Sequence, residues 1–395
     1  MAVELTYVLI TPYTILKSRT GGVMARLLSR TDLELVGAQI FSPTAELTKE
    51  YADSVYETIG RRDKESATML RNYIIASFSP VNNVRRRVMM LLFKGENACK
   101  KVYSIVGGIH PDAKTRDSKI TGETVRDTYA DLLLDENGDV RYFEPAVLTP
   151  PDYEYSLERL EMFAKFAGSQ PNLVEHLQYD DNQDIERTLT IIKPDNWRYP
   201  SSKPGNIIDI FSRAGLRIIG CKIFEMPIKD ALEFYGPVKD VLREKLAPRM
   251  GEKAKEILER ELKIKLPANS ANELTGIVGV QYADDQFNQI VGFMSGKRPD
   301  ECPPEDYSKP GVAKCMILVY EGKNAVKKIR DVLGPTDPTK APSGTVRKEF
   351  GQDIMVNTAH ASDSVESAQR EMGIVKMNCN TVSSIIFDYL KGRGK

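Results

Sequence analysis

The sequence lacks several features that would assign it to a class at once. No apolar run approaches the roughly 18 residues that a membrane-spanning helix needs, which excludes such a helix. The five cysteines are scattered, odd in number and without paired metal-ligand spacing, which is typical of reduced thiols in the cytosol. The three histidines are too few and too dispersed for a histidine-rich metal site.

Charge and composition exclude partners rather than suggest one. Lys plus Arg and Asp plus Glu cancel at 55 residues each, so no basic excess indicates a specific nucleic acid partner, and any anion site must be local. The initial segment MAVELTYVLITPY has no basic region before its apolar run and does not predict a signal peptide. With 395 residues, 41% hydrophobic and 28% charged, we expect a folded, cytoplasmic protein of two domains with no membrane partner.

What the chain does contain is an internal repeat. ELTYVLITPY at 4–13 aligns with ERTLTIIKPD at 186–195, and both read as a strand that ends at a proline. Three further pairs align in the same order: SRTDLELVGAQIF at 29–41 with SRAGLRIIGCKIF at 212–224, KGENACKKVYSIVG at 94–107 with EGKNAVKKIRDVLG at 321–334, and TVR at 124–126 with TVR at 345–347. The conserved order predicts two copies of one domain.

The two copies are expected at residues 1–168 and 185–395, joined by a linker at 169–184. Residues 155–167 carry apolar side chains at helical spacing and are predicted to form the last helix of the first copy. The second copy has two inserts. One is charged and helix-prone, at about 241–286, and the other is a short exposed loop at 297–310, rich in Pro, Glu and Asp.

The order of predicted elements indicates the fold class. Each copy reads as strand, helix, strand, helical stretch, strand and helix, followed by a last strand and helix. This β-α-β-β-α-β order predicts an α+β protein made of two ferredoxin-like domains with antiparallel sheets and a helical insert in the second. We expect the helices of each domain to cover one face of its sheet.

One histidine stands in an unusual setting. The segment VNTAHASDSVESAQREM at 356–372 places His360 at the end of an irregular stretch, just before a predicted helix. Asp363 and Glu366 have the spacing of a capping box at the start of that helix. An anion near His360 would meet unpaired backbone N–H groups and the positive end of the helix. A neutral imidazole is well populated near pH 7, so His360 is a candidate nucleophile.

Side chains suited to phosphate occur upstream in the same copy. Lys193, Arg330, Thr336 and Arg347 each end a predicted strand or helix or lie in the loop that follows. A guanidinium binds phosphate oxygens with a planar fork, whereas a lysine acts as a mobile point charge. These residues are therefore candidate phosphate ligands.

Six blocks of the second copy carry a resemblance to a known family: IKPD at 192–195, FY at 234–235, YEGKNA at 320–325, RDVLGPT at 330–336, SGTVR at 343–347 and NTAHASDSVESA at 357–368. With these blocks the second copy resembles a nucleoside diphosphate kinase. The likeness covers nearly all of this copy apart from the inserts.

The resemblance implies catalytic roles for five positions. His360 would be the phosphorylated nucleophile, and Glu371 and Ser362 would orient its ring. Lys193 and Tyr235 would lie near the phosphate that is transferred. The γ-phosphoryl group of a nucleoside triphosphate would pass to His360 and then to a nucleoside diphosphate, which gives ping-pong kinetics.

The resemblance also implies a set of nucleotide ligands. The phosphates would be held by Lys193, Arg330, Thr336 and Arg347, the ribose hydroxyls by Asn357, and the base by the ring of Phe287. Mg²⁺ would arrive with the nucleotide phosphates, so no metal site made of protein side chains is implied.

Two other functions stay open at this point. Ala361 replaces the glycine that the family usually has after the nucleophile, and the larger insert lies next to the nucleotide cleft. The chain could therefore be a non-catalytic nucleotide-sensing or scaffold protein. Phosphoryl transfer to protein partners would need the same histidine and differ only in its acceptor.

The first copy resembles a kinase domain without its catalytic groups. Thr11 takes the position of Lys193, while Tyr103 and Ile109 match Arg330 and Thr336; of the set, only Arg126 and Tyr51 persist. No histidine corresponds to His360. Since members of the family usually assemble from dimers, we predict that the two copies form a pseudo-dimer within one chain, with a homo-oligomer left open.

Two charged segments have plainer interpretations. The basic run Arg85-Arg86-Arg87 could touch phosphate, but such runs usually form a solvated segment before a strand. The helix expected at 252–265 has apolar residues on one side and is predicted to dock on the protein's own surface rather than on a membrane.

Overall fold

The computed structural model describes residues 3–61, 63–82, 84–109, 122–137, 140–179 and 184–392. The chain forms two compact units. One unit comprises Met1–Ile223 and Met316–Lys395, and the other comprises Phe224–Cys315. Among the described residues, no helix is both long and apolar enough to cross a membrane.

The first copy begins with a strand and two helices and ends with a long helix. Its elements are β1 (Val3–Ile10), α1 (Pro12–Leu16), α2 (Thr20–Ser29), β2 (Glu34–Phe41), α3 (Ala45–Gly60), α4 (Lys64–Phe78), β3 (Val88–Glu96), α5 (Ala98–Val106), α6 (Val125–Tyr129), β4 (Asp131–Leu134), β5 (Val140–Glu144), β6 (Val147–Leu148) and α7 (Tyr153–Ala167). The helix expected at 155–167 is confirmed as α7. The β4–β5 hairpin was not predicted.

The second copy repeats this order around its insert. Its elements are β7 (Ile185–Ile192), α8 (Lys203–Ser212), β8 (Arg217–Glu225), α9 (Ile228–Phe234), α10 (Gly236–Lys245), α11 (Ala247–Leu262), α12 (Ser270–Leu274), α13 (Val280–Ser295), β9 (Lys314–Lys323), α14 (Ala325–Leu333), α15 (Val346–Phe350), β10 (Ala359–Ala361) and α16 (Val365–Ile374). A final helix, α17 (Val382–Gly392), follows.

The two main sheets have the same strand order. In the described residues one sheet runs β2-β3-β1-β6 and the other β8-β9-β7-β10, so each strand of the first main sheet has its counterpart in the second, and only the β4–β5 hairpin has none. The pairs β1–β3, β1–β6, β2–β3, β7–β9 and β7–β10 are antiparallel, as the sequence predicts. The structure is therefore an α+β fold with antiparallel sheets.

The backbone repeats as closely as the strand order does. Asn97 and Asn324, which precede α5 and α14, both adopt left-handed φ values, of 52° and 54°. Glu4 and Glu186 each accept a hydrogen bond from a backbone N–H in the first turn of these helices, that of Cys99 in one copy and of Val326 in the other. These two features identify equivalent positions in the two copies from the backbone and its hydrogen bonds.

The expectation that helices cover one face of each sheet is wrong for the first sheet. Along β1, Leu5, Tyr7 and Leu9 pack with α3, α4, α7 and α17, whereas Val8 and Ile10 pack with α2 and α5. Helices therefore lie on both faces. The unbroken apolar run VMMLLF at 88–93 in β3 is typical of a strand buried on both sides. This run could have predicted from the sequence that helices cover both faces of the sheet.

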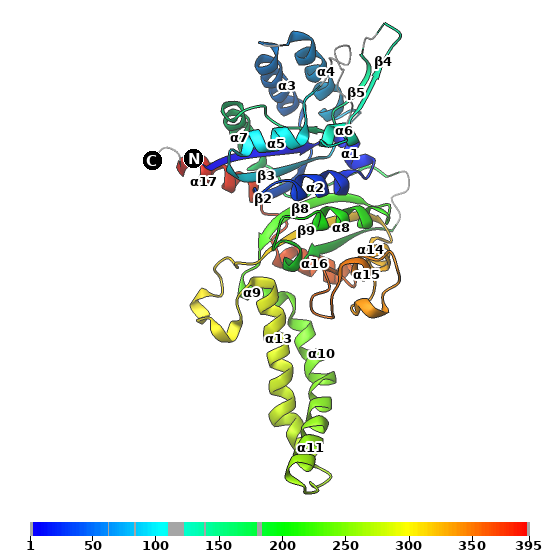
Figure 1. Ribbon diagram of the computed structural model, residues 1–395, viewed down its shortest axis with the longest axis vertical. Helices are drawn as coiled ribbons and strands as arrows, with labels where there is room; N and C mark the ends of the chain where they lie inside the picture. The colour runs from blue at the N-terminus through cyan, green and yellow to red at the C-terminus, as the bar shows by residue number, and fades with distance from the viewer. Residues whose placement is uncertain are drawn as a thin grey trace. The chain divides into compact units, whose positions relative to one another are not determined.

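The two copies share one hydrophobic core. Helix α2 packs directly on its counterpart α8, and the two helices lie between the two sheets (Figure 1). The crossing depends on two glycines, because a Cβ on Gly205 would lie 2.2 Å from the backbone nitrogen of Ala25, and one on Gly21 would lie 2.4 Å from that of Asp209. No side chain fits at either position.

Residues 180–183 of the predicted linker lie outside the described residues. The described part of the linker packs into the fold instead of forming a free connection. Asn172, Leu173 and Val174 are buried. Val174 donates a backbone hydrogen bond of 2.9 Å to Ile219, and Leu173 forms an antiparallel bridge with Gly220. The segment thus pairs with β8 of the second copy.

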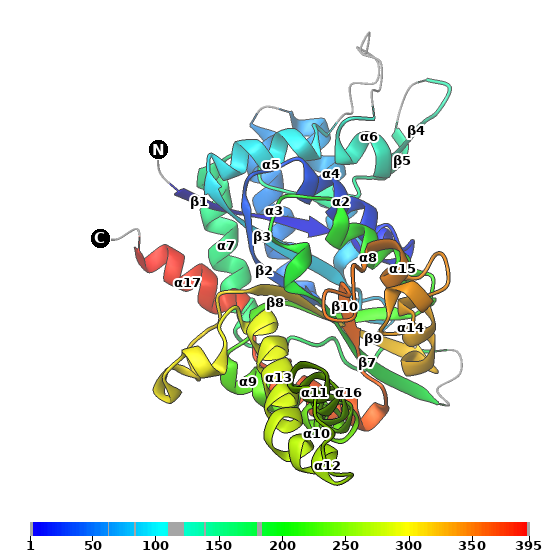
Figure 2. The same ribbon diagram turned by 60° about the horizontal axis from the view of Figure 1, so that its bottom comes forward.

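The last helix returns to the first copy. Val382 and Ile386 of α17 are buried in the core formed by α3, α4 and α7, and α17 lies beside α7 (Figure 2). Asn380 and Ser383 donate hydrogen bonds to the carbonyl groups of Ala167 and Ala164 at the end of α7. The C-terminal residues of the second copy therefore complete the core of the first.

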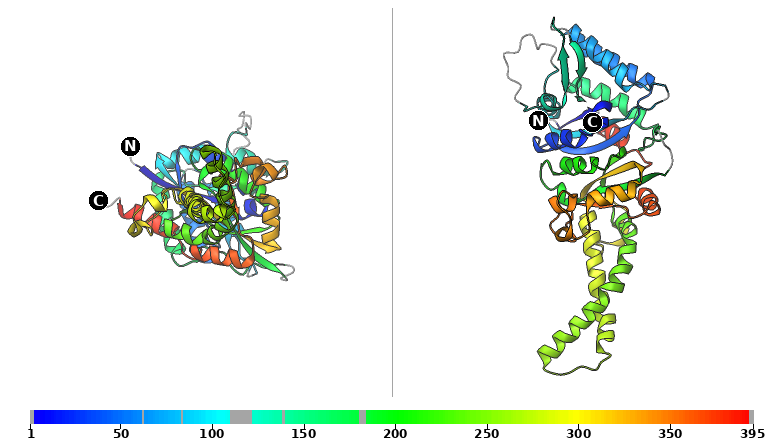
Figure 3. Two further views of the ribbon diagram at one scale, coloured as in Figure 1. Left: turned by 90° about the horizontal axis from the view of Figure 1, so that it is seen from below. Right: turned by 90° about the vertical axis from the view of Figure 1, so that its right-hand side faces the viewer.

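The unit Phe224–Cys315 is largely helical and spans both predicted inserts (Figure 3). Arg243 of α10 and Asp284 of α13 form a bidentate ion pair with distances of 2.7 and 2.6 Å. Gly279 lets α11 pass close by, because a Cβ there would lie 2.2 Å from the carbonyl oxygen of Ala247. The 297–310 segment forms two short 3₁₀ turns with mostly exposed side chains.

Candidate active site

His360 lies in the middle of a short edge strand. It pairs with Ile191 of β7 within β10, so the irregular stretch expected there is wrong at the histidine itself. The following helix begins one residue later than the predicted capping box requires: Ser364, not Asp363, is the N-cap and accepts a hydrogen bond from the Ser367 N–H. The strand pairing fixes the backbone of His360.

The imidazole is held by a buried carboxylate. His360 Nε2 lies 3.0 Å from Oε2 of Glu371, and the same oxygen accepts a 2.6 Å hydrogen bond from Ser362 Oγ. Glu371 and Ser362 are buried, whereas the His360 side chain is 21% exposed. Since a carboxylate only accepts, Nε2 carries the proton in the neutral ring and the lone pair is on Nδ1. Of the two residues expected to orient the ring, Glu371 thus contacts it directly, and Ser362 acts through Glu371.

Lys193 and Asn357 meet beside this strand. Lys193 Nζ donates a 2.6 Å hydrogen bond to Asn357 Oδ1, and the Lys193 backbone N–H donates to the carbonyl of Thr358. Asn357 is buried, and its amide nitrogen donates to the carbonyl groups of Ile354 and Thr336. The loop containing Thr336 is therefore held at the same place.

Arg347 joins the cluster from α15. Its guanidinium donates to the carbonyl groups of Gly334 and Ala359, at 2.9 and 3.1 Å, and Ala359 directly precedes His360. Burial, reinforced by the charge of Arg347, lowers the pKa of Lys193 to about 8. The two cations therefore repel each other, and a bound polyanion would offset this repulsion.

Arg330 is the last of the expected phosphate ligands. It lies in the last turn of α14 and is exposed. A hydrogen bond from Ser367 lowers the pKa of Asp363, and the charges of Arg330 and His360 act in the same direction. The Arg330 guanidinium and the His360 ring are therefore both near this one carboxylate. The structure thus brings together His360, Glu371, Ser362, Lys193, Asn357, Thr336, Arg347 and Arg330.

Three residues at this site were not found from the sequence. Asn196 donates to the carbonyl groups of Lys193 and Thr358, which ties the turn after β7 to the segment before His360. Thr358 has a φ of 73°, a strained value for a β-branched residue. Burial raises the pKa of Asp195, against the charges of Lys193 and Lys203. Only the proximity of Asp195 to Lys193 in the sequence hinted at any of them.

Two expected site residues belong to the other unit. Tyr235 follows α9, is buried, and lies with its ring centroid 4.9 Å from that of Phe234. Phe287 lies in α13, and its ring is 2% exposed with the Lys239 ammonium 5.5 Å from its centroid. Among the described residues, no group of three His, Cys, Asp or Glu side chains is placed to hold a metal ion.

Comparison with known proteins gives a consistent result. The sequence profile described as "Nucleoside diphosphate kinase" matches residues 305–379. Nucleoside diphosphate kinase 2 of Protochlamydia amoebophila is 31% identical over 188 residues, which is 48% of this chain and 89% of that protein. The nucleoside diphosphate kinase of Nitratiruptor sp. is also 31% identical, over 48% of this chain and 93% of its own. The chain belongs to the nucleoside diphosphate kinase family.

Among solved structures, the chain is similar to the nucleoside diphosphate kinase of Aquifex aeolicus, at 27% identity over 48% of this chain and 94% of that one. The TM-score is 0.29, so we base the description of the fold on its own strand order.

The first copy of this family member keeps the geometry of Arg347. Arg126 donates to the carbonyl groups of Gly107 and Val147, the counterparts of Gly334 and Ala359. Gly107 and Gly334 have φ values of 88° and 85°. Arg126 therefore stabilises the fold at this position, and its persistence does not require a ligand.

The nucleophile position of the first copy is occupied by a leucine. Val147 pairs with Ile10 as Ala359 pairs with Ile192, so the next residue, Leu148, has the register of His360. Leu148 is buried among apolar side chains. The first copy thus has no imidazole and no access to solvent at this point.

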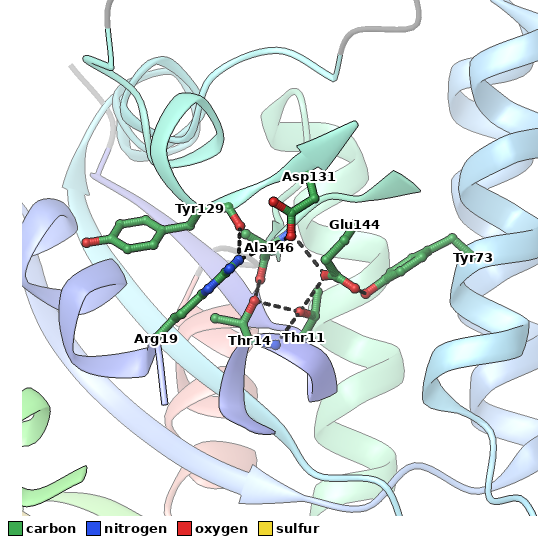
Figure 4. A network of polar contacts seen from close by, with 8 residues as sticks. All are labelled: Thr11, Thr14, Arg19, Tyr73, Tyr129, Asp131, Glu144 and Ala146. Carbon is green, nitrogen blue, oxygen red and sulfur yellow. Dashed lines mark hydrogen bonds and ion pairs between the residues drawn. The ribbon is translucent and has the colours of Figure 1, made fainter. Parts of the chain in front are cut away.

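A carboxylate replaces the amide that binds Lys193. Glu144 accepts hydrogen bonds from Thr11, the counterpart of Lys193, at 2.8 Å and from Tyr73 at 2.7 Å (Figure 4). Thr11 also donates its backbone N–H to Ala146, as Lys193 does to Thr358. The lysine ammonium of the second copy is therefore replaced by a hydroxyl, and its neutral amide acceptor by a carboxyl group.

Proposed function

We propose that this chain transfers the γ-phosphoryl group of a nucleoside triphosphate to a nucleoside diphosphate through a phosphohistidine at His360. The proposal depends on one observation: the bond from His360 Nε2 to Glu371 leaves the lone pair on Nδ1, in a ring that is partly exposed beside Lys193 and Arg347. A nucleophile and its charge-stabilising groups are thus assembled before substrate arrives.

The chemistry would proceed in two mirrored halves. Nδ1 forms a bond to the γ-phosphorus while the bond to the β,γ-bridging oxygen breaks, and the diphosphate leaves with that electron pair. No proton is transferred, because Nε2–H stays bonded to Glu371, which stabilises the positive charge that develops on the ring. A second nucleoside diphosphate then attacks the phosphorus from its terminal phosphate oxygen and frees His360.

The substrate ligands in this proposal are the residues that the family resemblance implies. Arg330, Thr336, Arg347 and Lys193 would hold the phosphates, with Mg²⁺ entering as part of the nucleotide. Tyr235 would approach the transferred phosphate. The side-chain amide of Asn357 now donates hydrogen bonds to two backbone carbonyl groups, and it would also have to bind a ribose hydroxyl. Stacking on Phe287 would require its covered ring to become exposed.

The proposal assigns different tasks to the two copies. Residues 185–395 would form the catalytic domain with its inserts, and residues 1–168 a degenerate ferredoxin-like copy joined through 169–184. The α2–α8 contact and the shared core support a pseudo-dimer within one chain. The buried Leu148 and the acidic Glu144 support the absence of catalysis in the first copy.

Labelling with γ-³²P ATP tests the function. We expect an acid-labile, base-stable label on the wild type and on the control His176→Ala, which alters an exposed histidine, but none on His360→Ala. Adding a nucleoside diphosphate should release the label as triphosphate. A wild-type protein that binds the nucleotide but never becomes labelled would favour the sensor or scaffold function instead.

A further inference from the structure

A polar cavity lined by the first copy, the linker and β8 of the second copy shares no lining residue with the His360 cluster. Its volume is about 390 Å³, and it is bounded by α1, the C-terminal part of α4, the segment before β3, β5, residues 177–178 and Arg217 of β8. Arg85, Arg86 and Arg87 all line it; they lie directly before β3 as the sequence predicts, and Arg85 is exposed, but Arg86 and Arg87 are half-buried.

The charges around this cavity are unbalanced. Among its described lining residues are the arginines 85, 86, 87 and 217, against one carboxylate, Glu144. The Glu144 oxygens already accept hydrogen bonds from Thr11 and Tyr73. Glu321, whose charge also acts on Arg87, is ion-paired with Arg187 at 2.8 Å.

Two of the arginines are fixed in place by backbone carbonyl groups. Arg87 Nη1 donates to Ile218 at 2.6 Å, and Arg217 Nη1 donates to Gln178 at 2.6 Å. Burial lowers the pKa of Arg87 to about 10, and the charge of Arg217 acts in the same direction. The two guanidinium groups are thus close and repel each other, which an anion between them would reverse.

A third arginine has an unused donor. The Nε of Arg86 is buried and has no hydrogen-bond partner among the residues that the structure describes. A buried N–H without a partner destabilises a fold, so it is seldom retained unless something binds it. The wall nearby includes the aromatic side chains of Tyr13 and Tyr142.

We propose that this cavity binds a small organic phosphate, with Arg86, Arg87 and Arg217 holding its phosphate oxygens and Tyr13 and Tyr142 flanking its organic part. Guanidinium forks match phosphate oxygens in pairs, and several forks around one cavity suit a multivalent phosphate better than a single carboxylate. The volume is within the range of small-molecule sites. The first copy, together with Arg217 of β8, would then bind a ligand without catalysis.

The experiment separates this cavity from the His360 site by substitution. In an Arg330→Ala background, which weakens the candidate active site, pyrophosphate and ADP binding are measured by calorimetry for Arg86→Ala, Arg217→Ala and the control Arg260→Ala, which removes an exposed arginine of the other unit. We expect the background and Arg260→Ala to bind pyrophosphate alike, and Arg86→Ala and Arg217→Ala to bind it about tenfold more weakly.

Three outcomes would overturn the proposal. Equal affinity in Arg86→Ala and Arg260→Ala would show that the cavity is not used. An affinity for citrate equal to that for pyrophosphate would contradict phosphate recognition. If ADP bound no more tightly than pyrophosphate, the proposed role of Tyr13 and Tyr142 in binding the organic part would be wrong. If the variants fold poorly, protection of Arg86 and Arg217 from phenylglyoxal by pyrophosphate, read by mass spectrometry on the intact protein, decides the same question.

Discussion

At the scale of single residues, the tautomer of the His360 ring is selected by a side chain eleven positions further along the chain. Glu371 is buried, and a buried carboxylate must be hydrogen-bonded to be tolerated. It meets that need with Ser362 and with the imidazole N–H at once. Ala361, the departure from the family glycine, pairs with Thr190 in ordinary strand geometry, so its methyl group leaves the ladder intact.

Glu371→Gln should slow the chemistry and leave nucleotide binding almost unchanged. The amide keeps the shape but loses the negative charge that stabilises the phosphorylated ring, which removes a charge-assisted hydrogen bond of about 1.5–3 kcal/mol. We expect kcat to fall by about 10–100-fold with little change in KM. The control is Glu366→Gln, an exposed acid on the same helix; an equal loss in both variants would contradict the positioning role.

Lys193 should give the enzyme an alkaline limit. Its pKa is lowered to about 8, so the ammonium that attracts phosphate is lost as the pH rises through that value. We expect kcat/KM, which reports the free enzyme, to fall about tenfold per pH unit well above pH 8. Lys193→Arg should remove this limb, because a guanidinium stays charged there; an unchanged limb would assign it to another group.

At the scale of elements, equivalent strands carry unlike chemistry on the same backbone. β6 and β10 pair with β1 and β7 in the same register, yet one presents Leu148 and the other His360. Helices α2 and α8 show the opposite case, since both need a glycine at their crossing. The repeat is therefore strict where backbones touch and free where a side chain alone decides function.

Gly205→Ala should weaken the contact between the copies. The added Cβ would lie 2.2 Å from the Ala25 backbone nitrogen, and the helices would have to move apart. We expect the free energy of unfolding to fall by about 1–3 kcal/mol in a denaturant titration. Gly373→Ala in α16 is the control, because nothing lies within 4 Å of its Cβ position, and it should be neutral or stabilising by up to about 1 kcal/mol.

At the scale of the whole molecule, the hydrophobic core of each copy includes residues from the other copy. Helix α17 supplies Val382 and Ile386 to the first copy, and residues of both copies share the core around α2 and α8. Segment 172–174 also pairs with a strand of the second copy. We therefore regard the two copies as one cooperative structure.

Ile386→Ala should destabilise the first copy although it lies in the last helix of the chain. Ile386 is fully buried, so its truncation leaves a cavity beside α7. The expected loss is about 2–5 kcal/mol in the free energy of unfolding. Ile264→Ala, at a half-exposed isoleucine, should cost far less. Unfolding of β1 and α7, followed by hydrogen exchange, should accelerate only in Ile386→Ala.

Much of the candidate site could be predicted because its residues stand next to recognisable local signals. Lys193 follows a strand that ends at a proline, and His360 precedes a helix start. Asn196 could not be found in this way, because its two acceptors, Lys193 and Thr358, come together only through the pairing of β7 with β10. The same holds for Arg86, whose neighbours in the cavity lie far away in the chain.

By itself the sequence determined the repeat, most of the order of strands and helices in the two main sheets, and the histidine with its candidate ligands, because periodicity and motif spacing are local properties of the chain. Only the tertiary structure decided which imidazole nitrogen bears the lone pair, that helices cover both faces of the first sheet, and that α17 belongs to the core of the other copy. Each of these depends on contacts between residues distant in sequence. Such contacts are determined by which apolar faces of helices and sheets pack against each other.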